Sequence, residues 1–402
     1  MTHHIFAARG GRAISFALLF LLVPMFAFSQ AQWPAKALVP NEPLDVRLNS
    51  AFGSGTALSG GRAMVGAPNT DGHGAVYLFE QRGGSWPQTQ KLIAPDVAPG
   101  NFGTGIVLKG DTALISDNGR NLVYSFDRVN GTGPYRATAI LRGGVELFGS
   151  ALALEGCTAL ISSGAHGSPA QHGYVHVYNR CPDGKWVWKG SFLSPDASAA
   201  DRFGASLALS GSNLLVGAPG TASNAGAAYH YVYTNGAWHL KQKLTQASAH
   251  AGNQFGWGVG FRSGLAAVGA PYSLSAGGEG EVSLFKQVNG SWVPSGLLYA
   301  PNIAGTGATS QFGYKIRVTD DRVYVNSQPI DYYHLGYTLT VFRRAGDTLP
   351  FEQQFGPGDQ NDLAGYAFDV DGRGLIIGNP AQQGPGPFQS SGGATIYQVP
   401  AP

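Results

Sequence analysis

The sequence predicts an all-β protein, a seven-bladed β-propeller of four-stranded antiparallel blades. Three observations predict this fold class. First, Phe-Gly or a relative begins a similar segment about every 50 residues, which indicates a repeat architecture. Second, each segment contains short β-like stretches separated by turn residues, as strands of a meander would. Third, the chain has 59 Gly residues, 11% aromatic residues and only 12% charged residues, whereas about 25% are charged in an average globular protein.

The repeats share one internal order. They start near residues 52, 102, 148, 203, 255, 312 and 364, and Ala364-Gly365 replaces Phe-Gly in the last. An alternating first strand and a tight turn lead to a second strand that ends in Gly-Ala-Pro or a relative, and a Gly-led third strand follows. The next turn is Asn-Gly at Asn235-Gly236 and Asn289-Gly290. Asn-Gly accepts the positive φ angles of a tight hairpin, so the third and fourth strands are expected to pair antiparallel.

The two ends of the repeat array predict how the ring closes. The last repeat stops at Pro402, after its third strand, and lacks a fourth. Residues 33–40, WPAKALVP, match the fourth-strand pattern of the first repeat, WPQTQKLIAP. A fourth strand donated from this segment would complete the last blade and pair an edge that would otherwise be exposed. We therefore expect residues 32–402 to form a single propeller.

Side-chain size alternates along the first strands. Leu152 and Leu154 alternate with Ala151 and Ala153, for example, so the two faces of the strand differ in bulk. A bulky face on one blade can then pack against a small face on the next. Three charged residues break the small column in repeats six and seven: Lys315, Arg317 and Asp369. We expect an internal ion pair among them, with a substrate site as the alternative.

The motif pair Phe-Gly and Gly-Ala-Pro resembles the FG-GAP repeat family, whose repeats also build the N-terminal propeller of integrin α-subunits. The resemblance covers roughly residues 33 to 400 and implies a seven-bladed ring, with adhesion or ligand binding as the commonest theme. In integrin-like repeats, some hairpins between the first two strands carry a calcium loop with alternating acidic residues. None of the corresponding hairpins here has three alternating carboxylates, and Asp369 and Asp371 come nearest. We therefore expect no cofactor, with calcium at Asp369 and Asp371 as the alternative.

The N-terminal segment, residues 1–31, predicts a cleaved signal peptide. Arg9 and Arg12 precede an apolar run over residues 13–28, and Ser29 and Ala31 supply the small residues of a cleavage site. The run is shorter than a membrane-spanning helix, and no later segment is long and apolar enough to span. The mature chain is therefore expected to be secreted, periplasmic or on the cell surface, and monomeric. A net charge of +2 supplies no basic stripe for nucleic acid.

Two sets of residues are candidates for covalent or metal chemistry. Cys157 and Cys181 are the only cysteines, and the repeat alignment puts them at the same end of neighbouring strands, so we predict a disulfide in an oxidising compartment. His166, His172 and His176 cluster around the third strand of repeat three. Three imidazoles can bind zinc or copper, but no carboxylate lies among them, so solvated histidines are the favoured interpretation. The serines lack the context of a nucleophile elbow, and no catalytic residue is predicted.

Acidic residues recur before the repeat starts, at Asp96, Asp196, Asp201, Asp359 and Asp362. Short acids commonly cap turns through backbone N–H groups, and a ligand-binding rim is the alternative. These connections and the loops between second and third strands emerge on one face of the ring, which we call the loop face. The function expected is binding or adhesion to a glycan or protein through this face. The alternatives are a hydrolase or lyase with an unrecognised site, which should show a deep polar pocket, and a structural envelope protein.

Overall fold

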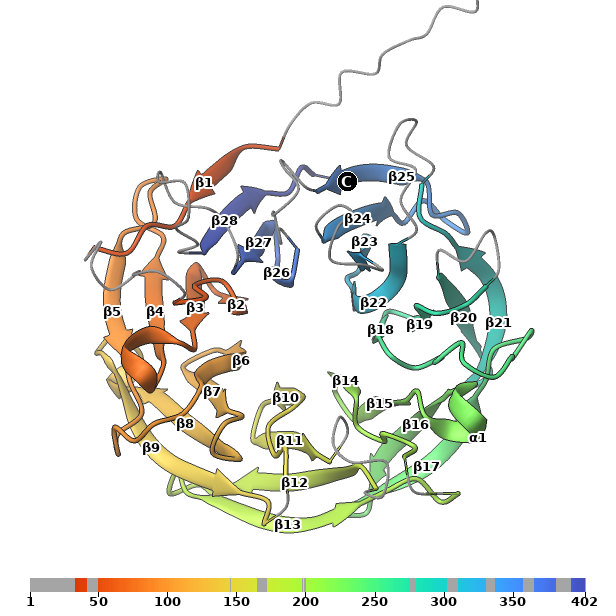
Figure 1. Cartoon of the computed structure of the whole chain (residues 1–402), viewed down its shortest axis with the longest axis horizontal. Helices are drawn as coiled ribbons and strands as arrows, with labels where there is room; N and C mark the ends of the chain where they lie inside the picture. Colours follow the sequence, from red (N-terminus) through yellow and green to blue (C-terminus); the bar gives the residue numbers. More distant parts are fainter. Residues whose placement is uncertain are drawn as a thin grey trace, which may run out of the picture. The chain divides into compact units, whose positions relative to one another are not determined.

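Seven four-stranded antiparallel sheets surround a common axis (Figure 1). The computed structural model describes residues 33–41, 50–144, 146–164, 172–196, 198, 200–274, 280–301, 310–329, 337–356, 365–380 and 392–401. The chain divides into residues 1–32 and residues 33–402, and the second unit holds all seven sheets. The predicted signal peptide lies outside the described residues. The predicted seven-bladed propeller of four-stranded blades is confirmed.

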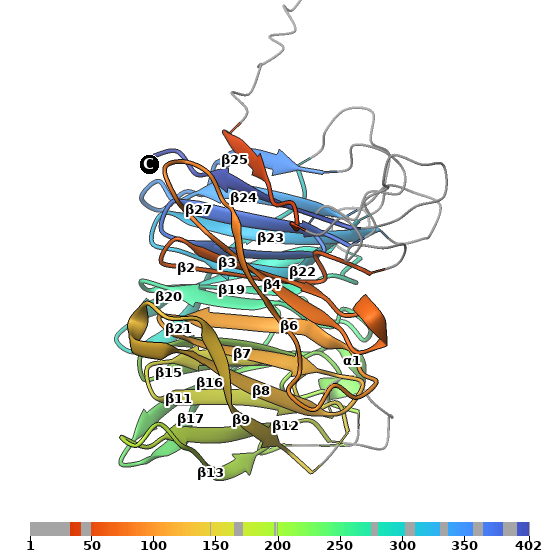
Figure 2. The same cartoon turned by 90° about the vertical axis from the view of Figure 1, so that its left-hand side faces the viewer.

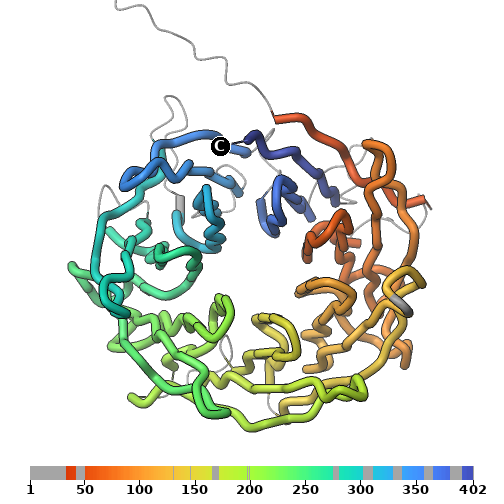
Figure 3. The backbone as a smooth tube through the Cα atoms, turned by 180° about the vertical axis from the view of Figure 1, so that it is seen from behind, coloured from red at the N-terminus to blue at the C-terminus, as the bar shows by residue number. Residues whose placement is uncertain are grey.

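Blades 1 to 6 run outward from the axis in chain order, and in blade 7 the N-terminal strand is outermost. Figures 2 and 3 show the same ring from the side and from behind. The innermost strands are β2 (Gly55–Ser59), β6 (Phe102–Lys109), β10 (Leu152–Glu155), β14 (Ser206–Ser210), β18 (Val259–Arg262), β22 (Ser310–Val318) and β26 (Ala367–Asp371). The second strands are β3 (Arg62–Ala67), β7 (Thr112–Asp117), β11 (Thr158–Ser163), β15 (Asn213–Ala218), β19 (Leu265–Ala270), β23 (Arg322–Pro329) and β27 (Gly374–Asn379). The third strands are β4 (Ala75–Glu80), β8 (Leu122–Arg128), β12 (Tyr174–Arg180), β16 (Ala227–Thr234), β20 (Glu281–Val288), β24 (Thr338–Arg343) and β28 (Gly393–Gln398). The outermost strands are β5 (Gln88–Leu92), β9 (Tyr135–Arg142), β13 (Trp186–Phe192), β17 (Ala237–Leu244), β21 (Ser291–Leu298), β25 (Phe351–Phe355) and, in blade 7, β1 (Ala35–Ala37).

The N-terminal strand closes the ring, as predicted. β1 pairs antiparallel with β28, with Lys36 opposite Ile396, and the Trp33 side chain is buried at the same seam. Trp33 packs edge-on against Phe355 of blade 6, with ring centres 5.3 Å apart. The guanidinium of Arg322, also in blade 6, lies 5.8 Å from the Trp33 ring centre. The closing segment therefore connects blade 7 to blade 6 as well as completing blade 7.

Arg322 is fully buried at this seam. Its Nε and Nη2 donate to the two carboxylate oxygens of Glu352 at 2.8 and 2.9 Å. Nη2 also donates to the carbonyl oxygen of Pro400 at 3.1 Å, and Nη1 pairs with Asp321. A buried guanidinium needs such partners because desolvation is otherwise costly. The C-terminal segment is thus tied to the same arginine that Trp33 covers.

The two repeated motifs meet between blades. The Phe-Gly glycines all have φ angles between 90° and 103°, a region that side chains with a Cβ rarely adopt. The Gly-Ala-Pro glycine of one blade lies against the Phe-Gly glycine of the next blade. At Gly217, an added Cβ would lie 1.9 Å from the carbonyl oxygen of Gly256. Gly66, Gly269 and Gly378 are in equally close contact with the next blade. The motif residues therefore form the seam between adjacent blades.

The predicted alternation of bulk is confirmed in the same seams. Gly258, just before β18, and Gly260 on β18 lie against Ile316 and Val318 on β22. The predicted internal ion pair is present too, because Arg317 Nε lies 3.4 Å from Asp369 Oδ1. In blades 1 to 6, the pairing of the third and fourth strands shifts register once. Such bulges twist an outer edge away from further strand pairing.

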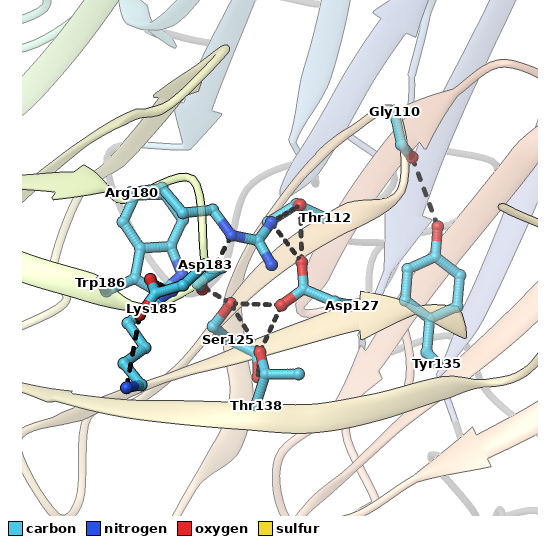
Figure 4. Close-up of polar contacts among 11 residues, drawn as sticks. Gly110, Thr112, Ser125, Asp127, Tyr135, Thr138, Arg180, Asp183, Lys185 and Trp186 are labelled. Carbon is cyan, nitrogen blue, oxygen red and sulfur yellow. Dashed lines mark hydrogen bonds and ion pairs between the residues drawn. The ribbon is translucent and has the colours of Figure 1, made fainter. Parts of the chain in front are cut away.

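A polar contact joins blades 2 and 3 away from the axis (Figure 4). Arg180 Nη1 on β12 lies 2.7 Å from Asp127 Oδ1 on β8. The same carboxylate oxygen accepts a hydrogen bond from Thr112 Oγ1 at 2.7 Å. The Trp186 indole N–H donates to Ser125 Oγ at 3.0 Å. Side chains of blade 3 therefore satisfy polar groups of blade 2.

Replacing Asp127 with Asn is expected to lower the free energy of unfolding by about 1–3 kcal/mol, because a largely buried guanidinium loses its carboxylate partner. Asp183→Asn is the matched control, since Asp183 and Lys185 form an exposed pair in the same region and such pairs contribute about 0–1 kcal/mol. Urea denaturation of both purified variants measures the difference. Equal loss of stability in the two would contradict the role given to Asp127.

Candidate functional site

An axial cavity of about 330 Å³ is lined by the innermost strands of blades 2 to 7 and by the turns that follow them. Three of the four carboxylates in its lining bind backbone amides across the blade seams, and the fourth, Asp320, pairs with Arg262. Glu155 Oε1 accepts from the Gly211 N–H at 3.0 Å. Asp369 Oδ2 accepts from the Leu58 N–H at 3.0 Å, and Asp371 Oδ2 from the Gly60 N–H at 2.6 Å. These groups therefore hold neighbouring blades together.

Three of the described candidate metal ligands have other partners. Asp369 and Asp371 make the amide contacts just described. His176 is buried on β12, where Nε2 hydrogen-bonds with Ser163 Oγ at 2.7 Å, and burial lowers its pKa to about 4. His172 precedes β12, and His166 lies outside the described residues. Within the described ranges, no group of three or more His, Cys, Asp or Glu side chains is arranged to hold a metal ion.

The cysteines lie at the same end of neighbouring strands. Cys157 directly precedes β11 and Cys181 directly follows β12. The carbonyl oxygen of Cys157 accepts from the Arg180 N–H at 2.7 Å, which brings the two backbone segments together. Both cysteines are free thiols in the structure. The disulfide between them stays a prediction.

Three of the five acidic residues of the predicted rim have internal partners. Asp96 forms two hydrogen bonds with the Arg120 guanidinium, at 2.8 and 2.5 Å, and these hold its pKa well below the usual range. Asp196 accepts from the Tyr229 hydroxyl at 2.6 Å. Asp201 caps a turn by accepting from the Ser198 N–H at 2.7 Å. Asp359 and Asp362 lie outside the described residues.

A cluster of aromatic side chains occupies the loop face over blades 5 to 7. We call Trp257, Tyr272, Tyr314, Tyr337 and Tyr366 the aromatic cluster. Trp257 lies two residues before β18 and Tyr272 two residues after β19, so both lie at the loop-face ends of their strands. Tyr337 directly precedes β24, and Tyr366 directly precedes β26. The cluster thus draws on three consecutive blades.

The rings contact one another in two groups, Trp257 with Tyr272 and Tyr314, and Tyr337 with Tyr366. The Trp257 ring centre lies 5.0 Å from that of Tyr314 and 6.0 Å from that of Tyr272. Tyr337 and Tyr366 pack edge-on at 5.3 Å. Burial raises the pKa of Tyr314 to about 12, and both Tyr272 and Tyr366 act on it electrostatically. Tyr366 retains 44% of its surface exposed, whereas the other four rings are half-buried.

Two cations accompany the cluster. The Arg202 guanidinium lies 5.7 Å from the Trp257 ring centre, and its Nη1 donates to Gln254 Oε1 at 3.4 Å. Lys315 follows Tyr314 on β22, and its ammonium lies 5.5 Å from the ring centre of Phe368 in blade 7. Burial lowers the pKa of Lys315 to about 8; Arg317 adds to this and Asp369 opposes it.

The aromatic cluster was not among the residues that the sequence predicted, although the signal is visible once repeats are aligned. The residue directly after Phe-Gly is small in the first four repeats, where it is Ser54, Thr104, Ser150 and Ala205. In the last three repeats the same position holds Trp257, Tyr314 and Tyr366. Lys315 was noted as a break in the small column, but its neighbours across the blade seam were not predictable.

Comparisons with known proteins address the fold. The family model described as FG-GAP repeat matches residues 186–233, a span that includes β14 and β15 of blade 4. No curated protein sequence matches the chain.

Two similar solved structures come from Bacteroides uniformis and Bacteroides fragilis, and each is titled a "putative 6-phosphogluconolactonase". Both are 12% identical to this chain. The first covers 76% of this chain and 85% of its own, with a TM-score of 0.52, and the second 76% and 84%, with a TM-score of 0.50. The likeness shows a shared propeller fold. Within the described residues, no helix has the length and apolar character needed to cross a membrane.

Proposed function

We propose that this seven-bladed β-propeller, whose residues 186–233 match the FG-GAP repeat model, is a binding protein that recognises a carbohydrate through the aromatic cluster on its loop face. The observation that carries this proposal is the run of Trp257, Tyr314 and Tyr366 in successive repeats. Four other blades form with Ser, Thr or Ala at that position, so the fold itself does not require aromatic rings there.

The chemistry of the cluster suits a sugar. Sugar rings present C–H groups that stack on aromatic faces, while their hydroxyls take hydrogen bonds from tyrosine hydroxyls and a guanidinium. Tyrosine and tryptophan combine an apolar face with a polar group, and a rigid scaffold holds them at little entropic cost. The cluster also lies among the variable loops, where binding residues concentrate on repeat scaffolds.

The axial cavity gives less support to a hydrolase or lyase. A general acid or base must be free to approach the substrate. Three cavity carboxylates, Glu155, Asp369 and Asp371, are already bound to backbone amides of adjacent blades. The fourth, Asp320, forms an ion pair with Arg262 at 3.2 Å. Binding at the loop face is therefore the function better supported by the contacts of the described residues.

We also propose that the protein acts outside the cytoplasm, after removal of residues 1–31. The basic, apolar and small-residue regions of that segment support export. Polysaccharides are abundant in such compartments, and the predicted disulfide between Cys157 and Cys181 would form there.

Replacing Tyr366 with Ala is expected to weaken carbohydrate binding by about tenfold or more, because it is the exposed ring of the cluster and an aromatic anchor commonly contributes over 1 kcal/mol. Sugars that bind the wild-type protein are identified on a glycan array and then measured by calorimetry.

Trp188→Ala is the matched control. Trp188 is 57% exposed, but it lies on β13, the outermost strand of blade 3, so its loss should leave affinity unchanged. A blank glycan array would overturn the proposal. So would sugar binding that is insensitive to Tyr366→Ala.

A further inference from the structure

Lys315 occupies a position that the fold reserves for small side chains. The equivalent residues of the other six repeats are Gly55, Gly105, Ala151, Ser206, Gly258 and Ala367. The close contacts of Gly258 with the backbone of the next blade explain the restriction. Blade 6 nevertheless places a lysine there, and its chain crosses the seam to Phe368.

The lysine reaches from blade 6 to blade 7 at the level of the aromatic cluster, because its ring contact, Phe368, lies two residues after Tyr366. It is the neighbour of Tyr314 on β22, and the strand across the seam begins next to Tyr366. Within the described ranges, the ammonium has no ion pair or hydrogen bond; Arg317 repels it, and Asp369 attracts it from β26. A partly buried charge without a hydrogen-bonded partner destabilises a fold, so its presence calls for a role outside folding.

Arg202 supplies a second positive group at the other end of the cluster. Its contacts with described residues are the Trp257 ring and the neutral amide of Gln254. In this it differs from Arg120 and Arg322, which have carboxylate partners. Both cations of the aromatic cluster therefore lack a carboxylate partner in the described part of the chain.

We propose that the carbohydrate bound by the aromatic cluster is acidic, an oligosaccharide of uronic acid residues whose carboxylates are bound by Arg202 and Lys315. This inference rests on the proposed carbohydrate-binding function and specifies its ligand class. The rings stack on the sugar faces, and the two cations form charge-assisted hydrogen bonds with carboxylates, which are stronger than neutral ones. Neutral sugars fill only the aromatic part of the site.

The test uses matched pairs of probes: oligogalacturonate, oligomannuronate and a glucuronate-containing oligosaccharide, each with its carboxyl methyl ester. Esterification removes the charge and keeps the sugar ring. At least one acid is expected to bind about tenfold more tightly than its ester, as one charged hydrogen bond allows. Arg202→Gln and Lys315→Met should each reduce that ratio severalfold, and the exposed Lys185→Met should not.

The affinity should also depend on pH in one direction. The Lys315 ammonium is charged below its pKa of about 8 and neutral above it, so acid binding should weaken from pH 7 to pH 9. The ester should show no such change, and Lys315→Met should abolish the dependence for the acid. Arg317 and Asp369, the charged groups that act on Lys315 from β22 and β26, are unchanged in that variant.

Stability gives an independent measurement on Lys315. Its pKa in the folded protein is lower than in the unfolded chain, so the charge opposes folding below about pH 8, and stability should rise between pH 8 and about 10.4. Lys315→Met should raise the melting temperature at pH 7 by about 2–6 °C and remove that rise. A lower melting temperature would show an internal partner for the ammonium and overturn its role in binding.

The outcomes separate the two proposals. Neutral sugars that bind through Tyr366, with acids no tighter than their esters, would overturn the acidic ligand and leave carbohydrate binding standing. No binding of any sugar, acidic or neutral, would overturn both. A preference for acids that persists unchanged in both Arg202→Gln and Lys315→Met would overturn the assignment of these two residues.

Discussion

Deletion of residues 33–40 is expected to lower the free energy of unfolding by about 5 kcal/mol or more, a large part of the total stability of a domain. The deletion removes β1 from the edge of β28 and two buried side chains, Trp33 and Leu38. It also uncovers Arg322, which Trp33 covers at 5.8 Å. Trp33→Ala alone should cost about 3–5 kcal/mol, as for other buried aromatic truncations.

The measurement is chemical denaturation monitored by far-UV circular dichroism, because the deletion removes a tryptophan and would alter a fluorescence signal. Lys36→Ala is the matched control, because Lys36 lies on the same strand with an exposed side chain and should change stability by no more than about 0.5 kcal/mol. An unchanged denaturation midpoint after the deletion would mean that the seventh blade is complete without β1.

Replacing Gly217 with Ala is expected to destabilise the propeller by about 3 kcal/mol or more, or to prevent folding. The new Cβ would lie 1.9 Å from the Gly256 carbonyl oxygen and 2.4 Å from Ser206 Oγ. The first contact is with backbone of the next blade, so relief requires the two blades to separate, and overpacked cores respond with strain of this order.

The control for Gly217 is Gly211→Ala in the same blade. Gly211 lies in the turn between β14 and β15 with φ of 57°, and an added Cβ would meet no atom within 4 Å. Only the left-handed backbone penalty applies there, about 1 kcal/mol. Melting curves of both variants compare the two effects. If Gly211→Ala cost as much as Gly217→Ala, blade contact would not be the reason for the Gly-Ala-Pro glycine.

The fold could be predicted from the sequence because the seams between blades impose local residue requirements. Gly256 must adopt a positive φ, and Gly217 must lack a Cβ, so both recur at fixed places in the repeat. The closing strand was predictable for a similar reason. Residues 33–40 share their pattern with the fourth strand of the first repeat, including a Trp-Pro pair at the start.

The candidate site was less predictable because it depends on differences between repeats. Trp257 and Tyr314 lie more than fifty positions apart in the chain, and only the ring geometry brings them to 5.0 Å. The acidic residues were visible in the sequence, but their partners were not. Asp96 is held by Arg120 from a loop of the next blade, a contact that no local pattern encodes.

The contacts between blades also determine which segment of this chain could be exchanged with a related propeller without disrupting the ring. A glycine from one repeat fits against a glycine from the next, as Gly217 does against Gly256. A segment that runs from one Phe-Gly to the next therefore carries one side of the contact with the preceding blade and one side of the contact with the following blade. Exchanging blades between related propellers should succeed more often when the exchanged segment is chosen so that both halves of each seam come from one parent. The unit to exchange is thus the contact between two blades. The sequence repeat shows only how far apart these contacts lie along the chain.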